Sequence, residues 1–393
     1  MDMALTEQQR ASQQAFRQWV ETHVEPVADE HDSAQRTPQS MIDAMAAEGY
    51  LGALIDSEYG GGSMDAVSWG LLCEEFGRGS ASLLSLLTVH GMVLQSIAKW
   101  GTEAQKANWL PKLASGAAVG AFGLTEPNVG SDAKSIESVA VEQADGSFLL
   151  NAEKRWISFG DSANLILIIA KVDDKPAAFL VQSNMAGFSR EPITGMLGFR
   201  AANIAKLVMK DVVVPAENLL GRVGFGFSHI ANTALDHGRY CVGWGCVGLA
   251  QAALDASMAY AGERRQFGEA LNKHQLIQQL LADMVVDIKA ARMLNYHAAY
   301  LKDIGEPSLI METSMAKYFA SRVAVKATDS AVQIHGANGC SSDYPVQRFY
   351  RDAKIMEIIE GSNQMQQIII AKSGYQQHLV AKRAARRAKQ PQE

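Results

Sequence analysis

One glutamate in the chain, Glu360, has the surroundings of an acid–base catalyst. It follows the apolar pair Ile358–Ile359 and precedes Gly361, at a break between two apolar segments. A carboxylate at such a break is either a helix-end residue or a base whose pKa is raised by partial burial, because an apolar environment disfavours the charged form. The second interpretation would give the protein a group that removes protons near neutral pH.

A glycine- and hydroxyl-rich turn is the second candidate. The run Phe122-Gly-Leu-Thr-Glu-Pro-Asn-Val-Gly-Ser-Asp132 combines an apolar start, two hydroxyls and the turn-forming Pro127. Glycine lets the backbone approach a ligand closely, so this turn can direct N–H groups and hydroxyls at one polar ligand. A capped turn between two domains has the same composition, and the segment alone does not separate the two interpretations.

Three further segments have residue types suited to a ligand. Trp156-Ile157-Ser158 ends a predicted strand, where the indole either covers a flat aromatic ligand or packs as an ordinary strand residue. Arg264 and Arg265 lie at the end of a predicted helix, where their guanidinium groups either bind phosphate or interact favourably with the negative end of the helix dipole. Gln333-Ile-His335-Gly336-Ala337-Asn338-Gly339 is a polar turn whose histidine is expected to be structural.

One apparent nucleotide motif is misleading. Gly243-Trp-Gly-Cys-Val-Gly248 fits the dinucleotide pattern G-x-G-x-x-G. That pattern needs a preceding strand and a helix that opens at the glycines, whereas residues 240–260 are predicted to be helical throughout. We therefore interpret these glycines as positions where helices pack closely.

The elements that must position these residues fall into three regions. Residues 1–119 are predicted to form an N-terminal helical domain, residues 120–225 a middle β domain, and residues 226–381 a C-terminal helical bundle. Asp145-Gly146 predicts a hairpin. Short strands joined by Asp, Gly and Pro turns, with residues 207–209 and 212–214 as two separate strands, predict a small antiparallel barrel or sandwich. The fold class is therefore α+β and mostly α. The basic tail, residues 382–393, is predicted to be frayed and solvated, with docking to an acidic partner as the alternative.

Composition limits the classes of function. A length of 393 residues with 48% hydrophobic and 20% charged residues is typical of a globular protein of two or three subdomains. A net charge of −6 argues against a nucleic-acid binder. The sequence gives no sign of a membrane span, a secretory signal or metal-ligand spacing among its four cysteines, so we expect a cytoplasmic protein without a metal.

Taken together and in order, these segments resemble the acyl-CoA dehydrogenase family of flavoproteins over nearly the whole chain. The specific matches are Leu124-Thr-Glu-Pro-x-x-Gly-Ser-Asp132, Trp156-Ile-Ser158, Arg264-x-Gln-Phe-Gly268, and Arg351-Asp352 leading to Glu360-Gly361-Ser362. The resemblance implies an FAD enzyme with a helix–β–helix subunit that assembles as a homodimer or homotetramer.

The resemblance also implies which residues bind the cofactor. Phe122 to Ser131 would line the flavin, with Leu124 and Thr125 at the isoalloxazine edge and Trp156, Ile157 and Ser158 beside the ring. The pyrophosphate and adenosine would be held, in part across a subunit interface, by a further set. The full predicted FAD set is Phe122, Leu124, Thr125, Gly130, Ser131, Trp156, Ile157, Ser158, Arg264, Gln266, Phe267, Gln275, Gln333, Gly336, Ala337, Ser362 and Gln364.

The catalytic base implied by the resemblance is Glu360. Some family members carry the base on an earlier helix instead, and here Gly238 matches that position, where no base is possible. Arg239, Ser131 and Gly361 would lie near the acyl thioester. Ala337, Ile359, Ser158, Ser362 and Gln367 depart from common family residues; the serines keep the hydroxyl, while Ile359 changes the wall beside the reacting bond.

The predicted reaction is FAD-dependent α,β-dehydrogenation of an acyl thioester. Glu360 would take the α-proton, and flavin N5 would accept the β-hydride. The thioester carrier is left open between coenzyme A and an acidic acyl-carrier protein, and an electron-transfer flavoprotein is the expected type of electron acceptor. A flavin-dependent oxidase or monooxygenase on the same scaffold is the alternative function.

Overall fold

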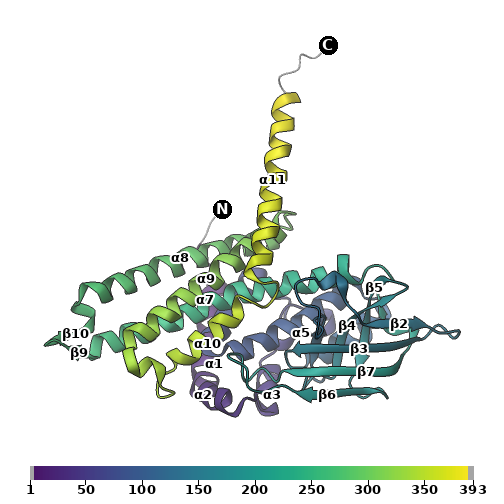
Figure 1. Cartoon of the computed structure of the whole chain (residues 1–393), viewed down its shortest axis with the longest axis horizontal. Helices are drawn as coiled ribbons and strands as arrows, with labels where there is room; N and C mark the ends of the chain where they lie inside the picture. Colours follow the sequence, from purple (N-terminus) through teal and green to yellow (C-terminus); the bar gives the residue numbers. More distant parts are fainter. Residues whose placement is uncertain (1–3, 388–393) are drawn as a thin grey trace.

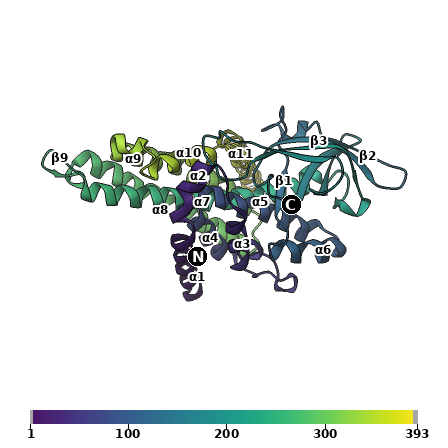
Figure 2. The ribbon, with the colours of Figure 1, turned by 90° about the horizontal axis from the view of Figure 1, so that it is seen from below.

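The computed structural model describes residues 4–387, with the side chains of the last helix described as far as Lys382. Figure 1 shows a β region at one end, long helices running to the other end, and an N-terminal group of helices packed beside them. Seen from below, the N-terminal helices lie between the sheet and the far tips of the long helices (Figure 2). The predicted order of helical, β and helical regions and the mostly helical fold class are confirmed.

The N-terminal region is a set of helices around one very apolar member, α5. The helices are α1 (Glu7–His23), α2 (Glu25–Ala34), α3 (Gln39–Ala47), α4 (Ala66–Gly79), α5 (Ala81–Trp100) and α6 (Glu103–Ala114). By length and composition α5 could cross a membrane, but 89% of its most apolar window is buried inside the protein. Its hydropathy is therefore explained by its place in the core, between the other helices and the sheet.

The middle region is a mixed sheet. Its strands are β1 (Gly120–Gly123), β2 (Val139–Glu142), β3 (Phe148–Ile157), β4 (Leu165–Val172), β5 (Lys175–Gln182), β6 (Phe188–Pro192), β7 (Ala205–Val214) and β8 (Leu219–Leu220). The strand order is β6-β7-β3-β2-β4-β5-β8, with β1 paired to β4. Val139–Asn151 pairing around Gly146, whose φ is 84°, confirms the predicted β2–β3 hairpin.

Two sequence expectations about this sheet were wrong in detail. The strands do not form a closed antiparallel barrel: β4 pairs in parallel with both β1 and β2, so the sheet is mixed. Residues 207–209 and 212–214, predicted as separate strands, form one strand, β7. The chain passes between them through Asp211, which has a φ of 52°, and the register with β3 shifts nearby. An Asp with a left-handed backbone is compatible with a bulge inside a strand as well as with a turn between strands, so Asp211 was wrongly interpreted as a turn.

The C-terminal region consists of long helices. They are α7 (Asn232–Glu263), α8 (Gln275–Asp303), α9 (Leu309–His335), α10 (Val346–Met356) and α11 (Asn363–Arg387), with a small hairpin, β9 (Arg265–Gln266) and β10 (Glu269–Ala270), between α7 and α8. The G-x-G-x-x-G run lies inside α7, as expected. A Cβ at Gly245 or Gly248 would overlap Leu84 or the backbone of Glu74, so these glycines allow α7 to pack closely on α5 and α4.

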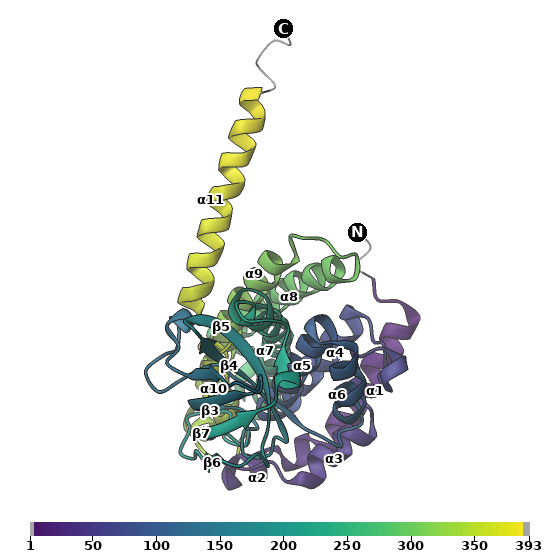
Figure 3. The same cartoon turned by 90° about the vertical axis from the view of Figure 1, so that its right-hand side faces the viewer.

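The last helix, α11, leaves the body of the protein. Figure 3 shows it rising alone, away from the sheet and the long helices. Residues 382–387, part of the tail predicted to be frayed, continue this helix, and residues 388–393 lie outside the described residues. Ile368, Tyr375 and Val380 on α11 are exposed.

Candidate functional site

The carboxyl group of Glu360 is buried on a strained turn. The residue has a φ of 57°, which a non-glycine residue rarely adopts, and Gly361 follows with a φ of 85°. Its Oε2 is shielded from solvent and receives no hydrogen bond from any residue between 4 and 387. Burial raises the pKa of Glu360 to about 8, against the opposing effect of the Arg239 guanidinium. Strain and an unpaired buried carboxyl group are features that cluster at active sites.

The backbone around Glu360 is held by side chains from three helices. Arg239 Nε, on α7, donates a hydrogen bond of 3.2 Å to the carbonyl oxygen of Glu360. Gln366, on α11, donates to the carbonyls of Glu360 at 3.2 Å and Gly361 at 3.0 Å. Lys317, on α9, donates to the carbonyls of Gly361 at 3.1 Å and Glu357 at 3.4 Å. These contacts fix the turn without occupying the carboxyl group.

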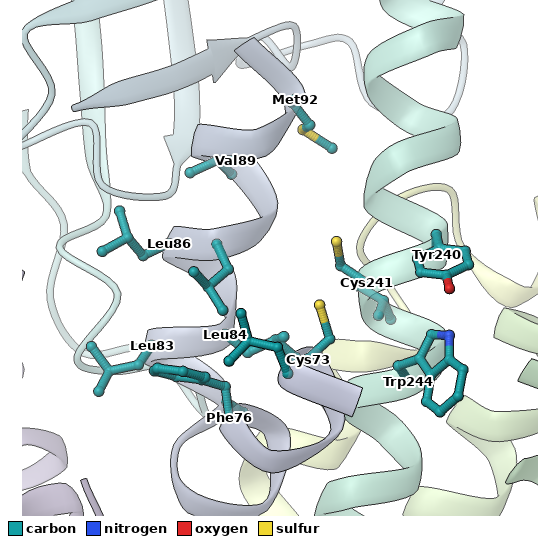
Figure 4. Close-up of a cluster of buried hydrophobic side chains, with 14 of the residues drawn as sticks. Cys73, Phe76, Leu83, Leu84, Leu86, Val89, Met92, Tyr240, Cys241 and Trp244 are labelled. Atoms are coloured by element: carbon teal, nitrogen blue, oxygen red, sulfur yellow. The ribbon is translucent and has the colours of Figure 1, made fainter. Parts of the chain in front are cut away.

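Gly238 provides the space in which that carboxyl group lies. A Cβ on Gly238 would overlap both Glu360 Oε2 and the terminal methyl of Met92. Gly238, which was predicted to match the alternative position of the base, therefore lies against the carboxyl group of Glu360. Figure 4 shows Met92 on α5 facing the α7 segment that carries Tyr240 and Cys241.

The turn Phe122–Asp132 is fixed to the sheet by a buried ion pair. Lys154 Nζ lies 2.6 Å from Glu126 Oε1 and donates to the Leu124 carbonyl at 3.1 Å. Glu126 also accepts hydrogen bonds from the backbone of Glu137 and from the backbone and hydroxyl of Ser138. Lys154 is fully buried, and burial lowers its pKa to about 8. The turn is therefore a built surface rather than a flexible linker.

Trp156 stands exposed at the edge of this surface. Its side chain is 46% exposed although it is a large aromatic, and its φ is 63°. The neighbouring Arg155 N donates to the Thr125 carbonyl at 2.9 Å, so the strand end and the turn lie side by side. Phe122 and Leu124 are buried beneath, whereas Gly130 and Ser131 are exposed. An exposed indole beside hydroxyl groups and backbone suits one face of a flat polar ring.

Helix α5 connects the two groups. His90 Nδ1 accepts a hydrogen bond of 3.0 Å from Gly120 N, at the start of the strand that leads into the turn. Two residues later Met92 lies against Gly238 and Glu360. Glu360 and the Phe122–Asp132 turn are therefore placed by opposite sides of one buried helix.

The remaining predicted cofactor residues lie elsewhere. Those on the β9–β10 hairpin and at the end of α9 are exposed, and they are adjacent to one another because the rings of Tyr260 and His335 stack 4.2 Å apart. Gly238 and Glu263 are separated by about 38 Å at 1.5 Å per helical residue, so this set lies far from Glu360. Figure 1 shows β9 and β10 at the opposite end of the protein from the sheet. This distant set is Arg264, Gln266, Phe267, Gln275, Gln333, Gly336 and Ala337.

Ser362 and Gln364 instead lie near Glu360 in sequence, at the start of α11. Sequence reasoning missed four residues of the site: Lys154, Glu126, Lys317 and Met92. Glu126 lies inside a quoted motif but had no role assigned, and Lys154 lies two residues before Trp156. The signal for Lys317 was the run of small residues around it, Thr313, Ser314 and Ala316, which indicates a closely packed helix face.

Models of known families match all three regions of the chain. The acyl-CoA dehydrogenase N-terminal domain matches residues 6–117, the middle domain residues 121–212 and the C-terminal domain residues 224–375. The chain belongs to the acyl-CoA dehydrogenase family, a family of flavin-dependent oxidoreductases.

Individual relatives agree over almost their full lengths. The chain is 39% identical to acryloyl-CoA reductase (NADH) of Anaerotignum propionicum, covering 95% of each chain. It is 38% identical to the short-chain-specific acyl-CoA dehydrogenase of Clostridium acetobutylicum, covering 94% of this chain and 99% of the relative. Its fold matches butyryl-CoA dehydrogenase of Megasphaera elsdenii with a TM-score of 0.92 at 37% identity, covering 95% and 99% of the two chains. The predicted family and class of reaction are confirmed.

Proposed function

We propose that this protein removes the α-proton of an acyl-CoA with Glu360 and passes the β-hydrogen to bound FAD. The observation that carries the proposal is the position of the Glu360 carboxyl group, which is buried, unpaired at Oε2 and seated against Gly238. A base needs a free lone pair beside the substrate and a pKa near the working pH. Burial supplies the second property, since it raises the pKa of Glu360 to about 8.

The surrounding residues orient the reaction and leave the base free. Arg239, Gln366 and Lys317 bind backbone carbonyls of the Glu360 turn, so its side chain keeps its lone pairs for a proton. Burial lowers the pKa of Arg239, yet it stays a cation, and its charge near the turn would favour the negative charge that develops on the thioester.

The exposed Trp156 and the clamped Phe122–Asp132 turn fit the ring of FAD. Indole, hydroxyl and backbone groups meet there, and the Arg155 guanidinium lies 4.5 Å from the centre of the Trp156 ring. When bound, the flavin would supply the acceptor for the hydride. Ser131 and Ser158 would meet its polar edge, and Trp156 would cover one face.

A second subunit would complete the cofactor site. The distant set around Arg264 and Gln333 lies at the opposite end of the protein from the sheet that carries Trp156 (Figure 1), so we infer that the two do not hold one molecule of FAD within one chain. A partner subunit could place its own distant set beside this Trp156, while this chain places its distant set beside the partner's Trp156. Both FAD sites would then be complete, as in a homodimer or a homotetramer built from dimers. The exposed Phe267, which is 97% exposed, would then be covered.

Coenzyme A is the favoured carrier over an acyl-carrier protein. The relatives at 38–39% identity are named for acyl-CoA substrates, and both are covered over nearly their whole length. The reduced enzyme would pass its electrons to an electron-transfer flavoprotein.

Anaerobic bleaching of the flavin against a panel of thioesters tests this function. Saturated short-chain acyl-CoA should bleach the FAD-loaded protein, and the same acyl groups on an acyl-carrier protein should do so more slowly. Faster bleaching by the carrier-protein thioesters would transfer the proposal to that carrier. If no saturated thioester bleaches the flavin, the dehydrogenase proposal is wrong.

A further inference from the structure

Lys317 is a buried cation without an acid bound to it. Its side chain is fully buried on α9, and no carboxylate of residues 4–387 lies within ion-pair distance of its Nζ. Its partners are all neutral: the carbonyls of Gly361 and Glu357 and the side-chain oxygen of Asn363 at 3.2 Å. A buried ammonium is costly, and its usual compensation is a bound carboxylate.

Lys317 and Arg239 are the two cations that oppose the rise in the pKa of Glu360 caused by burial. Glu357 binds Lys354 at 2.7 Å and accepts from Asn363, so its carboxylate is already engaged. Arg239, the other cation facing Glu360, interacts with Asp236 on the same helix as well as with Glu360, and its effect on the pKa of Glu360 is larger than that of Lys317. Against the effect of burial, Cys73 and His237 lower the pKa of Cys241 on α7, and the negative charge of Cys241 raises the pKa of Glu360. Met92 on α5 is neutral. Burial lowers the pKa of Lys317, the Cys246 thiol, Glu360 and Glu357 raise it in that order, and Arg239 lowers it. Glu360 is therefore the carboxyl group that acts most strongly on the charge of Lys317.

The same ammonium also determines where the base sits. Ser321 Oγ donates to Asn363 Oδ1 at 2.9 Å, and Lys317 donates to the same oxygen. Two side chains of α9 therefore bind Asn363, the first residue of α11. The carbonyl of Gly361 is bound by both Lys317 and Gln366. These bonds close a turn in which Glu360 has a left-handed backbone, and that conformation aims its carboxyl group at Gly238.

We propose that Lys317 is a positioning residue for the reaction: it holds the Glu357–Asn363 turn and supplies the positive charge that keeps Glu360 ionised when substrate is about to bind. The inference rests on the proposed role of Glu360 as the base. An opposite charge a few ångströms away favours the ionised form of a carboxyl group, typically by about one pH unit or more. Lys317 therefore offsets part of the rise in pKa that burial imposes on Glu360.

The test measures the rate of anaerobic flavin reduction by butyryl-CoA across pH in four variants of the FAD-loaded protein. Lys317→Met removes both charge and donors, Lys317→Gln removes the charge but keeps a donor for the Gly361 carbonyl, and Lys317→Arg keeps the charge. Lys326→Met is the matched control, because Lys326 lies on the same helix but binds the exposed Asp283 and Asp287.

Both neutral variants should move the rising limb of the pH profile upward by about one unit, whereas Lys317→Arg and Lys326→Met should keep it. Lys317→Met should also lower the plateau rate more than Lys317→Gln, because it alone loses every donor. An unmoved limb with a rate lowered equally at all pH values would overturn the proposal. So would loss of the fold in both neutral variants, which would make the charge a requirement of folding.

Failure of the underlying function gives a different result. If the wild-type protein is not bleached by any acyl-CoA, the proposed dehydrogenase activity fails before the variants are compared. If the wild-type protein is bleached and the limbs coincide, only the role of Lys317 fails.

Discussion

Two buried lysines hold the two halves of the site, and they do so in different ways. Lys154 fixes the Phe122–Asp132 turn and Lys317 fixes the turn that carries Glu360; both are fully buried, and burial lowers the pKa of each to about 8. Lys154 has a carboxylate partner, Glu126, at 2.6 Å, whereas Lys317 binds only neutral oxygens. The charge of Lys154 is neutralised by Glu126 and stabilises the fold. Within the described part of the chain, the charge of Lys317 has no bound carboxylate and can still act on Glu360.

The comparison separates a surface that binds from a centre that reacts. On the Lys154 side both carboxylate oxygens of Glu126 accept hydrogen bonds, which suits a rigid wall for a cofactor. On the Lys317 side Glu360 keeps an unpaired oxygen and a strained backbone, which suits a group that must change its protonation state.

The largest expected effect comes from removing Lys154 from its ion pair with Glu126. Lys154→Met would leave Glu126 buried without its cation, and breaking one side of a buried ion pair typically costs about 3–5 kcal/mol. Thermal and urea unfolding should show that loss. Lys154→Met/Glu126→Leu, which removes both charges, should recover part of it; a single variant as stable as the wild type would contradict the comparison.

The next effect concerns the space beside the base. Gly238→Ala places a methyl group where the Glu360 carboxyl group and Met92 now meet, and both can move because they are the ends of flexible side chains. The fold and bound FAD should survive, while flavin reduction falls by about 100-fold, as expected for a displacement of roughly 1 Å. An unchanged reduction rate would show that the carboxyl group acts from another position.

A smaller effect is expected at the binding surface. Trp156→Ala should weaken FAD binding by about tenfold, in line with the loss of one stacking contact, without shifting the pH profile of flavin reduction. Equilibrium titration of the apoprotein with FAD measures the affinity. A shifted pH limb in this variant would mean that the two sides of the site are not separable.

The smallest effect is on stability as a function of pH. The pKa of Glu360 is raised in the folded protein from 4.5 to about 8, so the folded state binds the proton more tightly. Its contribution to stability is present below the unfolded pKa and is lost as pH rises through about 8. Glu360→Gln should therefore raise the Tm by roughly 2 °C at alkaline pH, and this advantage should vanish near pH 4. A Tm difference that is the same at both pH values would argue against a perturbed carboxyl group.

Much of this arrangement could be predicted from sequence. The three-region order, the β2–β3 hairpin and the rejection of the Gly243–Gly248 motif follow from periodicity, turn residues and the requirement that a dinucleotide fingerprint open a helix. Glu360 and Gly238 were predicted as alternative positions for one base, and the structure brings them into contact. Local chemistry and ordered spacing carried these predictions.

The rest depended on distances that sequence order does not contain. Arg264 and Trp156 belong to one predicted FAD site but lie at opposite ends of the chain's fold, which only the length of α7 reveals. Lys317 carries no motif, and lysine is normally exposed, so nothing in its residue type indicates burial. The mixed sheet was missed because parallel pairing of β1 with β4 joins strands that are far apart in sequence.

Anaerobic reduction of the bound flavin by butyryl-CoA in Glu360→Gln tests the central claim most directly. The variant should bind FAD and butyryl-CoA with wild-type affinity and keep its oxidised flavin spectrum on a time scale in which the wild-type protein is fully bleached. Bleaching of the variant at the wild-type rate would show that Glu360 is not the base.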